Sequence, residues 1–255
     1  LVGLNYNSNA LTSFESPITF TTGTFTTSFD QKFVLADVDL DGKADVFSYS
    51  STGVPQVLRN TATAGVINAS TLAANVAITG VIPSSPTPKN VLSVDLNNDG
   101  KIDFANSNDT TTNGGSANIN TSTSGTPTLQ NYNSLLSSTS KYKVNAAFLP
   151  IDINLDGRTD IFGLNGQSIF NPSINSSYQS GYYLTQNTST GTSFSSSTGK
   201  SANANACKSC TDYLLVGPMY AADRADLNGD GKVDVVVAGK AVNILNNTTN
   251  PGSLT

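Results

Sequence analysis

The sequence predicts an all-β protein, built as a β-propeller-like array of about four four-stranded blades. Three observations carry this prediction. A nine-residue acidic segment recurs four times, and its copies begin 58, 57 and 74 residues apart, a spacing typical of propeller blades. Each copy lies between two short apolar runs of β-type residues. Each unit also contains a further apolar run that ends in Asn-Thr.

Within a unit we expect one strand to enter the acidic segment, a second to leave it, the Asn-Thr run to form a third, and a fourth to follow a Gly-containing turn. The entering strands are predicted at 33–36, 90–94, 146–151 and 219–225, and the leaving strands at 46–50, 104–106, 161–164 and 235–238. The Asn-Thr strands reach Asn60, Asn120, Asn187 and Asn247. Four-stranded units at a regular spacing favour a propeller, because neighbouring blades bury one another's faces.

One repeat domain is expected to span residues 1–255. It divides into a partial repeat at 1–30, three repeats at 31–88, 89–145 and 146–216, and an incomplete repeat at 217–255. These terminal half-repeats are expected either to close a ring or to join neighbouring subunits by strand addition. Because the chain starts at Leu1 without Met or a signal peptide, we expect a processed protein or a fragment of a longer one.

The acidic segment reads D-x-[DN]-x-D-G-x-x-D, with side-chain oxygens at positions one, three, five and nine. Calcium takes roughly six to eight oxygen ligands, and the Gly at position six allows the sharp turn that such a loop needs. The basic residue at position seven is expected to offer its backbone carbonyl and to point its side chain into water. The sequence thus predicts about four Ca²⁺ ions. Their ligands would be Asp37, Asp39, Asp41, Lys43 and Asp45; Asp95, Asn97, Asp99, Lys101 and Asp103; Asp152, Asn154, Asp156, Arg158 and Asp160; and Asp226, Asn228, Asp230, Lys232 and Asp234.

The acidic residues are concentrated in these segments. Of the 18 acids in the chain, 13 lie at positions one, three, five and nine, which argues against metal-free acidic turns that recur by chance. Three copies carry Asn in place of Asp at position three, which keeps an oxygen ligand and removes one charge. We therefore expect the first site to bind calcium most tightly.

The four loops, each followed by an apolar β-type run, resemble the FG-GAP or VCBS repeats of bacterial surface proteins and of the integrin alpha-subunit propeller. The resemblance covers nearly the whole chain. It implies calcium-binding blades and an extracellular or bacterial cell-surface location, and it leaves the ligand of the blades open.

Composition excludes several functions. The net charge is −5 and no basic patch is present, so a nucleic-acid partner is not expected. No apolar run approaches the ~20 residues that a membrane span needs. The chain has no His, which removes a Ser-His-Asp triad. The acids outside the loops show no catalytic spacing, and we expect no enzyme activity; they are Glu15, Asp30, Asp109, Asp212 and Asp223.

Two modifications are predicted. Cys207 and Cys210 form a C-x-x-C, for which we expect a local disulfide, because a zinc site would need two further ligands in a chain without His. The N-x-S/T pattern marks candidate glycosylation sites, many of them expected by chance in so Asn- and Thr-rich a chain. These sites are Asn68, Asn108, Asn120, Asn175, Asn187, Asn246 and Asn247.

The sequence as a whole favours a non-enzymatic, calcium-stabilised extracellular protein of structural or adhesive function, with self-assembly into a surface filament through the half-repeats. The alternative is a lectin-like module that binds a glycan or a host surface protein on one propeller face. Tyr178, Tyr182 and Tyr183 would suit sugar stacking, although Tyr in β-proteins more often packs half-buried on a strand.

Overall fold

A computed structural model describes most of the repeat region and little of the N-terminal part. The described residues are 17–18, 33–49, 54–68, 70–73, 76–77, 88–108, 115–132, 147–165, 169–171, 176–178, 181–190, 196–197, 201–203, 220–239 and 242–252. Their regular secondary structure consists of β-strands. Within these ranges no helix is long and apolar enough to cross a bilayer.

Units 1 and 2 are four-stranded antiparallel sheets in which strands adjacent in sequence are paired. Unit 1 contains β1 (Val34–Ala36), β2 (Asp45–Tyr49), β3 (Pro55–Leu58) and β4 (Val76–Ala77). Unit 2 contains β5 (Pro88–Val94), β6 (Asp103–Asn108), β7 (Gly115–Asn120) and β8 (Leu129–Tyr132). This confirms the predicted order of entering, leaving, Asn-Thr and fourth strands.

Units 3 and 4 follow the same order with local changes. Unit 3 contains β9 (Ala147–Ile151), β10 (Asp160–Asn165), β13 (Gly181–Asn187), β14 (Ser196–Ser197) and β15 (Ser201–Asn203). It also carries a separate hairpin of β11 (Ile169–Asn171) and β12 (Ser176–Tyr178), which the sequence did not predict. Unit 4 has three described strands, β16 (Ala221–Ala225), β17 (Asp234–Ala238) and β18 (Val242–Leu245).

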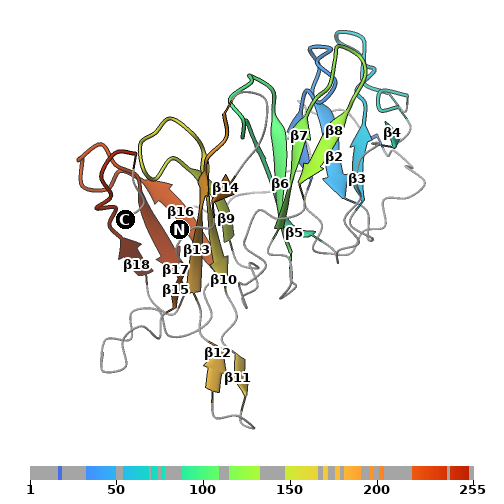
Figure 1. Cartoon of the computed structure of the whole chain (residues 1–255). Helices are drawn as coiled ribbons and strands as arrows, with labels where there is room; N and C mark the ends of the chain where they lie inside the picture. The colour runs from blue at the N-terminus through green and yellow to red at the C-terminus, as the bar shows by residue number, and fades with distance from the viewer. Residues whose placement is uncertain are drawn as a thin grey trace, which may run out of the picture.

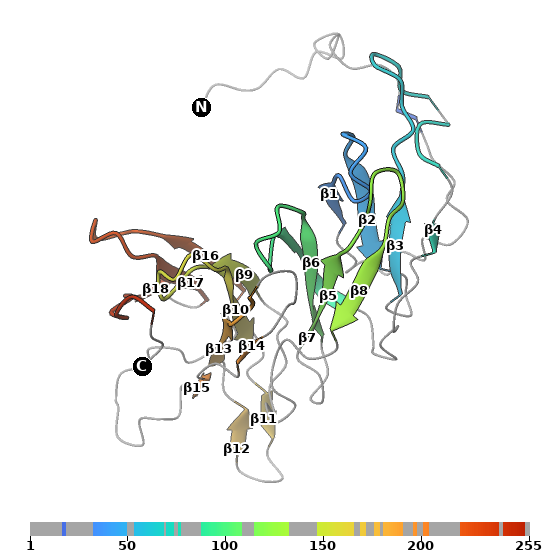
Figure 2. The ribbon, with the colours of Figure 1, turned by 45° about the horizontal axis from the view of Figure 1, so that its top comes forward.

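The four sheets stand side by side in an arc (Figure 1). In both views the sheets of units 1 and 4 lie at opposite ends, with units 2 and 3 between them (Figure 2). The arrangement is propeller-like, but the described sheets do not close into a ring. The expected partial repeat at 1–30 lies almost wholly outside the described residues, as do Cys207, Cys210 and Asn175. Of the expected incomplete repeat at 217–255, residues 220–239 and 242–252 are described.

The hydrophobic core lies between successive sheets. At the junction of units 1 and 2, Phe47 stacks on Phe104 with ring centroids 3.7 Å apart, in a cluster that also holds Val38 and Val57. Leu96 and Phe148 share the cluster between units 2 and 3. Phe162 and Val235 share the one between units 3 and 4. Each sheet thus buries one face against the next, as expected for repeats that are unstable alone.

Candidate metal centre

Four equivalent loops connect the first and second strands of the units: loop 1 (37–45), loop 2 (95–103), loop 3 (152–160) and loop 4 (226–234). Their backbones share two left-handed positions. The predicted Gly at position six has a φ of 80–87° in all four loops. Position four is also left-handed, which sequence reasoning missed; its occupants are Leu40 (58°), Asn98 (58°), Leu155 (55°) and Gly229 (77°). Asn98 and Gly229, two residues that favour this conformation, were the available signal.

Each loop is curled around its first carboxylate. In loop 1, Asp37 accepts the backbone N–H groups of Asp41 (3.0 Å) and Gly42 (2.9 Å), and Asp41 accepts that of Lys43 (3.0 Å). The same three hydrogen bonds recur in loops 2, 3 and 4. The sequence therefore folds four times into one oxygen-lined turn.

The ninth residue has a second structural function, which the sequence did not reveal. Asp45, Asp103, Asp160 and Asp234 are all buried and begin the second strands. One oxygen of Asp103 accepts the N–H of Leu96 (2.7 Å) at position two, and the other accepts that of Asn120 (2.7 Å). Asp45, Asp160 and Asp234 make the same pair of hydrogen bonds in their own units. Each carboxylate thus ties its loop to its Asn-Thr strand.

In units 2, 3 and 4, the Asn of the Asn-Thr strand links its unit to the preceding loop. The side-chain amide of Asn120 donates to the carbonyl of Val38 (3.1 Å), that of Asn187 to Leu96 (2.6 Å), and that of Asn247 to Ile153 (2.9 Å). The three acceptors all occupy position two of the loop. Loops 1, 2 and 3 therefore lie at the junctions between units.

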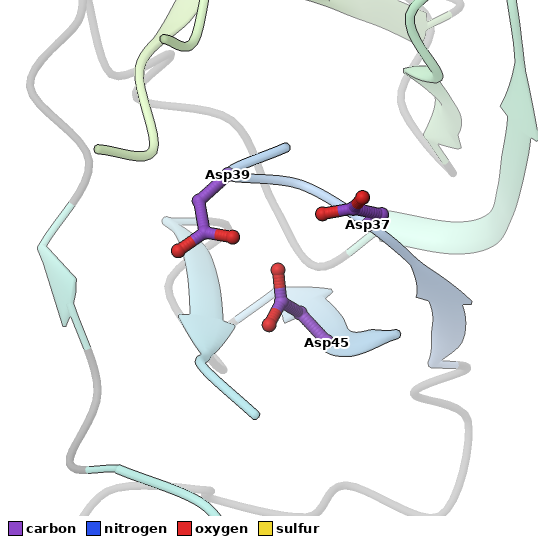
Figure 3. Close-up of side chains that lie close together, drawn as sticks. All are labelled: Asp37, Asp39 and Asp45. Carbon is purple, nitrogen blue, oxygen red and sulfur yellow. The ribbon is translucent and has the colours of Figure 1, made fainter. Parts of the chain in front are cut away.

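Loop 1 contains a candidate metal site. Oxygens of Asp37, Asp39 and Asp45 lie within 4.8 Å of one another, and their carboxylates point toward a common space (Figure 3). Asp39 is fully buried; its Oδ2 pairs with the guanidinium of Arg59, and its Oδ1 has no hydrogen-bond partner. A buried carboxylate oxygen without a donor is costly unless a cation meets it, so these residues fit a hard metal ion.

Loops 2 and 3 relieve the charge repulsion differently. The amide of Asn97 donates to Asp99 (3.2 Å), and that of Asn154 donates to Asp156 (3.2 Å). In loop 4, Asn228 instead donates to Asn246 (3.1 Å), and positions 226–231 are exposed. Among the described residues, the triad of acids close enough to hold an ion is the one in loop 1, because the other loops carry Asn at position three.

Burial shifts the titration of Asp45, Asp103 and Asp160. It raises the pKa of Asp103 to about 7 and that of Asp160 to about 6, against the hydrogen bonds from the backbone, which lower both pKa values. Burial also raises the pKa of Asp45. A carboxylate held in this way binds a proton readily when no metal ion neutralises it.

The expectation that the position-seven side chains point into water is wrong for two loops. Lys101 donates to the carbonyl of Ser122 (3.1 Å), and Arg158 donates to that of Ser189 (3.4 Å). Both acceptors lie two residues after the Asn of an Asn-Thr strand. Lys101 and Arg158 therefore hold the segment that follows the Asn-Thr strand of their own unit, and their positive charges lie beside loops 2 and 3.

The described glycosylation candidates fall into two groups. Asn120, Asn187 and Asn247 are buried and use their side-chain amides in the links between units, which argues against a glycan on the folded chain. Asn68 and Asn246 are exposed and remain predictions, as does Asn108.

Two other side chains singled out in the sequence have structural surroundings. Tyr182 stacks on Phe162 with ring centroids 5.5 Å apart, as expected for a strand residue. Asp223 is exposed on β16 and accepts the N–H of Arg224 (2.8 Å).

Comparison with known proteins supports the fold and leaves the family open. No protein-family profile matches the chain, and no curated protein is similar to it. A solved structure of a lectin from Agrocybe aegerita is similar, with a TM-score of 0.51 and 18% sequence identity over 87% of this chain. The chain spans 50% of the length of that lectin chain.

Proposed function

We propose that the protein is a non-enzymatic scaffold of structural or adhesive function, stabilised by calcium outside the cell. The observation that carries this proposal is the position of the four loops. Loops 1, 2 and 3 each combine an oxygen-lined turn with the acceptor of a hydrogen bond from the next unit, as Val38 does for Asn120. An ion held there stabilises the loop and, through it, the junction between two units.

Calcium suits the ligands. Asp37, Asp39, Asp41 and Asp45 with the Lys43 carbonyl would hold it in loop 1, and the same positions serve in the other loops. When bound, the ion neutralises carboxylates that otherwise repel one another. Loops with Asn at position three carry less charge, which suits weak sites that stay filled at extracellular calcium concentrations. The resemblance to FG-GAP or VCBS repeats of bacterial surface proteins agrees with this location.

Metal analysis and melting test the proposal. The native protein is expected to contain about four Ca²⁺ per chain. EDTA should lower Tm by tens of degrees, because an ion at ~100 times its Kd contributes ~2.7 kcal/mol per site. Mg²⁺, which demands a smaller octahedral site, serves as the control and should restore little of the loss. A protein without bound calcium and with the same Tm in chelator would rule the proposal out.

Glycan binding is the second candidate, because the similar lectin structure is described as specifically recognising non-reducing terminal N-acetylglucosamine. At 18% identity the similarity shows the fold alone. A glycan array that includes terminal N-acetylglucosamine, repeated with calcium and with EDTA, tests this candidate. Calcium-dependent signals that free N-acetylglucosamine competes away would support it, and a blank array at high protein concentration would exclude it.

A further inference from the structure

Three kinds of contact recur at the junctions between units. In each of them, a residue of the later unit, the donor side, meets the unit before it, the acceptor side. First, the Asn amide of one unit donates to the position-two carbonyl of the preceding loop, as described above. Second, Gly125 donates its N–H to the carbonyl of Asp39 (2.7 Å), and Gly252 donates to that of Asn154 (2.6 Å), both at position three. Third, the residue four before each loop packs against the preceding unit. Val91 and Phe148 are buried at this position, and Ala222 packs against the cluster between units 3 and 4.

Unit 1 carries a complete donor side with no unit before it in the described residues. Asn60 donates its amide to Ala44 of its own unit (3.0 Å), as Asn187 does to Thr159 (3.0 Å). Gly65 has a φ of 78°, the same value as Gly125 and Gly252. Phe33, four residues before loop 1, is 64% exposed. We call Phe33, Asn60 and Gly65, together with the neighbouring exposed Leu35, the donor end.

Unit 4 carries the matching acceptor side with no described unit after it. Among the described residues, the carbonyls of Leu227 and Asn228 meet no such donors. Leu227 is 49% exposed, whereas Val38 and Leu96 at the same loop position are fully buried. Ile244, three residues before Asn247, is 61% exposed, whereas Val57 and Ala117 at that position are fully buried. Leu227, Asn228, Ile244 and the neighbouring exposed Val242 form the acceptor end.

From these complementary ends we propose that the protein associates head to tail: the donor end of one copy docks on the acceptor end of a second copy. The contact repeats the contacts between units already present inside the chain, so the Asn60 amide reaches the Leu227 carbonyl and the Gly65 N–H reaches the Asn228 carbonyl. Phe33 then covers the apolar face around Ile244. Because the two surfaces differ, the interface is heterologous, and further copies add until a ring closes or a filament grows.

This interface differs from strand addition by terminal half-repeats, since it uses side chains and loop groups of units 1 and 4 and pairs no added strand. It rests on the proposed function in one respect, because loop 4 must be folded. Calcium removal is therefore expected to separate the copies as well as to loosen each one.

The test uses two full-length variants and light scattering with calcium. Val242→Lys/Ile244→Lys blocks the acceptor end, and Phe33→Lys/Leu35→Lys blocks the donor end; all four side chains are exposed, so the fold should be retained. The wild type should form species of two or more copies, and each variant alone should be monomeric. An equimolar mixture should form dimers that grow no further, because one good end remains on each variant. Ile102→Lys, which is exposed on loop 2 away from both ends, should assemble as the wild type does.

A wild type that stays monomeric at high concentration with calcium overturns the proposal, and so does a mixture that does not dimerise. Calorimetric calcium titration of the monomeric variants separates the two proposals. Normal calcium uptake without assembly of the wild type would contradict the head-to-tail interface alone. Assembly without calcium uptake would contradict the proposed calcium function alone.

Discussion

The guanidinium of Arg59 pairs with Asp39, the residue that gives loop 1 one more negative charge than the other loops. Arg59 also lies 3.9 Å from Asp41. This cation offsets the charge that led us to expect the tightest calcium binding at the first site. That expectation remains a prediction, and Arg59 is the residue to change in testing it.

Arg59→Ala should destabilise the calcium-free protein by about 3 kcal/mol, since it leaves Asp39 buried without a positive partner. Saturating calcium should recover most of this loss, because the ion replaces the missing charge. Urea unfolding in EDTA and in calcium measures both values, with Arg224→Ala on exposed β16 as the control. An equal loss under both conditions would show that no ion meets Asp39.

Two substitutions in loop 2 should distinguish the hydrogen-bonding function of Asp103 from the calcium-binding function of Asp99. Asp103→Asn should lower stability in EDTA by about 1–3 kcal/mol, because an amide cannot accept both the Leu96 and Asn120 N–H groups with full strength. Asp99→Asn should change the EDTA value less and reduce the calcium-induced rise in Tm. Melting curves of the two variants with and without calcium make the comparison; identical behaviour would contradict the assignment.

The pH dependence of stability should change sign with calcium. An Asp ordinarily titrates near 3.8, whereas in the fold the pKa of Asp103 is about 7 and that of Asp160 about 6. Between the ordinary pKa and these raised pKa values, the folded state binds more protons than the unfolded state. Stability in EDTA should therefore fall as pH rises from about 4 to about 8. Calcium needs the deprotonated carboxylates, so with calcium stability should rise over the same range. Tm measured at pH 5 and pH 8 in each buffer decides; a Tm in EDTA that rises with pH would contradict the shifted titrations.

Position four of the loops offers a stabilising substitution. Leu155 has a φ of 55° and is 39% exposed, so Leu155→Asn removes backbone strain with little loss of packing. We expect a gain of about 1 kcal/mol in the free energy of unfolding, measured in urea. The reverse change at the same position of loop 2, Asn98→Leu, should destabilise the protein by a similar amount. It also removes the hydrogen bond from the Asn98 amide to the Gly157 carbonyl (3.2 Å). A loss of stability in Leu155→Asn would argue against the strain.

The side-chain hydrogen bonds of the Asn residues should contribute more to stability in the middle of the array than at its end. Asn187→Ala should cost about 2–4 kcal/mol, because the buried carbonyl of Leu96 and the partly buried carbonyl of Thr159 both lose a donor. Asn60→Ala should cost less in the monomeric Val242→Lys/Ile244→Lys variant, because in the monomer the Asn60 amide donates to the Ala44 carbonyl of its own unit. Chemical unfolding of the two variants compares them, and equal losses would show that the link between units contributes nothing.

The sequence alone determined the features that repeat locally. Four copies of one nonapeptide, each flanked by apolar runs, were enough to place the entering and leaving strands, the left-handed Gly at position six and the acidic character of the loops. These follow from side-chain chemistry and backbone preferences within about ten residues.

Only the tertiary structure decided what each oxygen and amide does. Asp103 and Asp99 look alike in the sequence, but Asp103 is buried between two backbone N–H groups that the fold brings together. Asn187 and Leu96 are 91 residues apart, yet they share a hydrogen bond because neighbouring sheets pack face to face. Burial and contacts between units depend on how the sheets stack, and no local pattern encodes that arrangement.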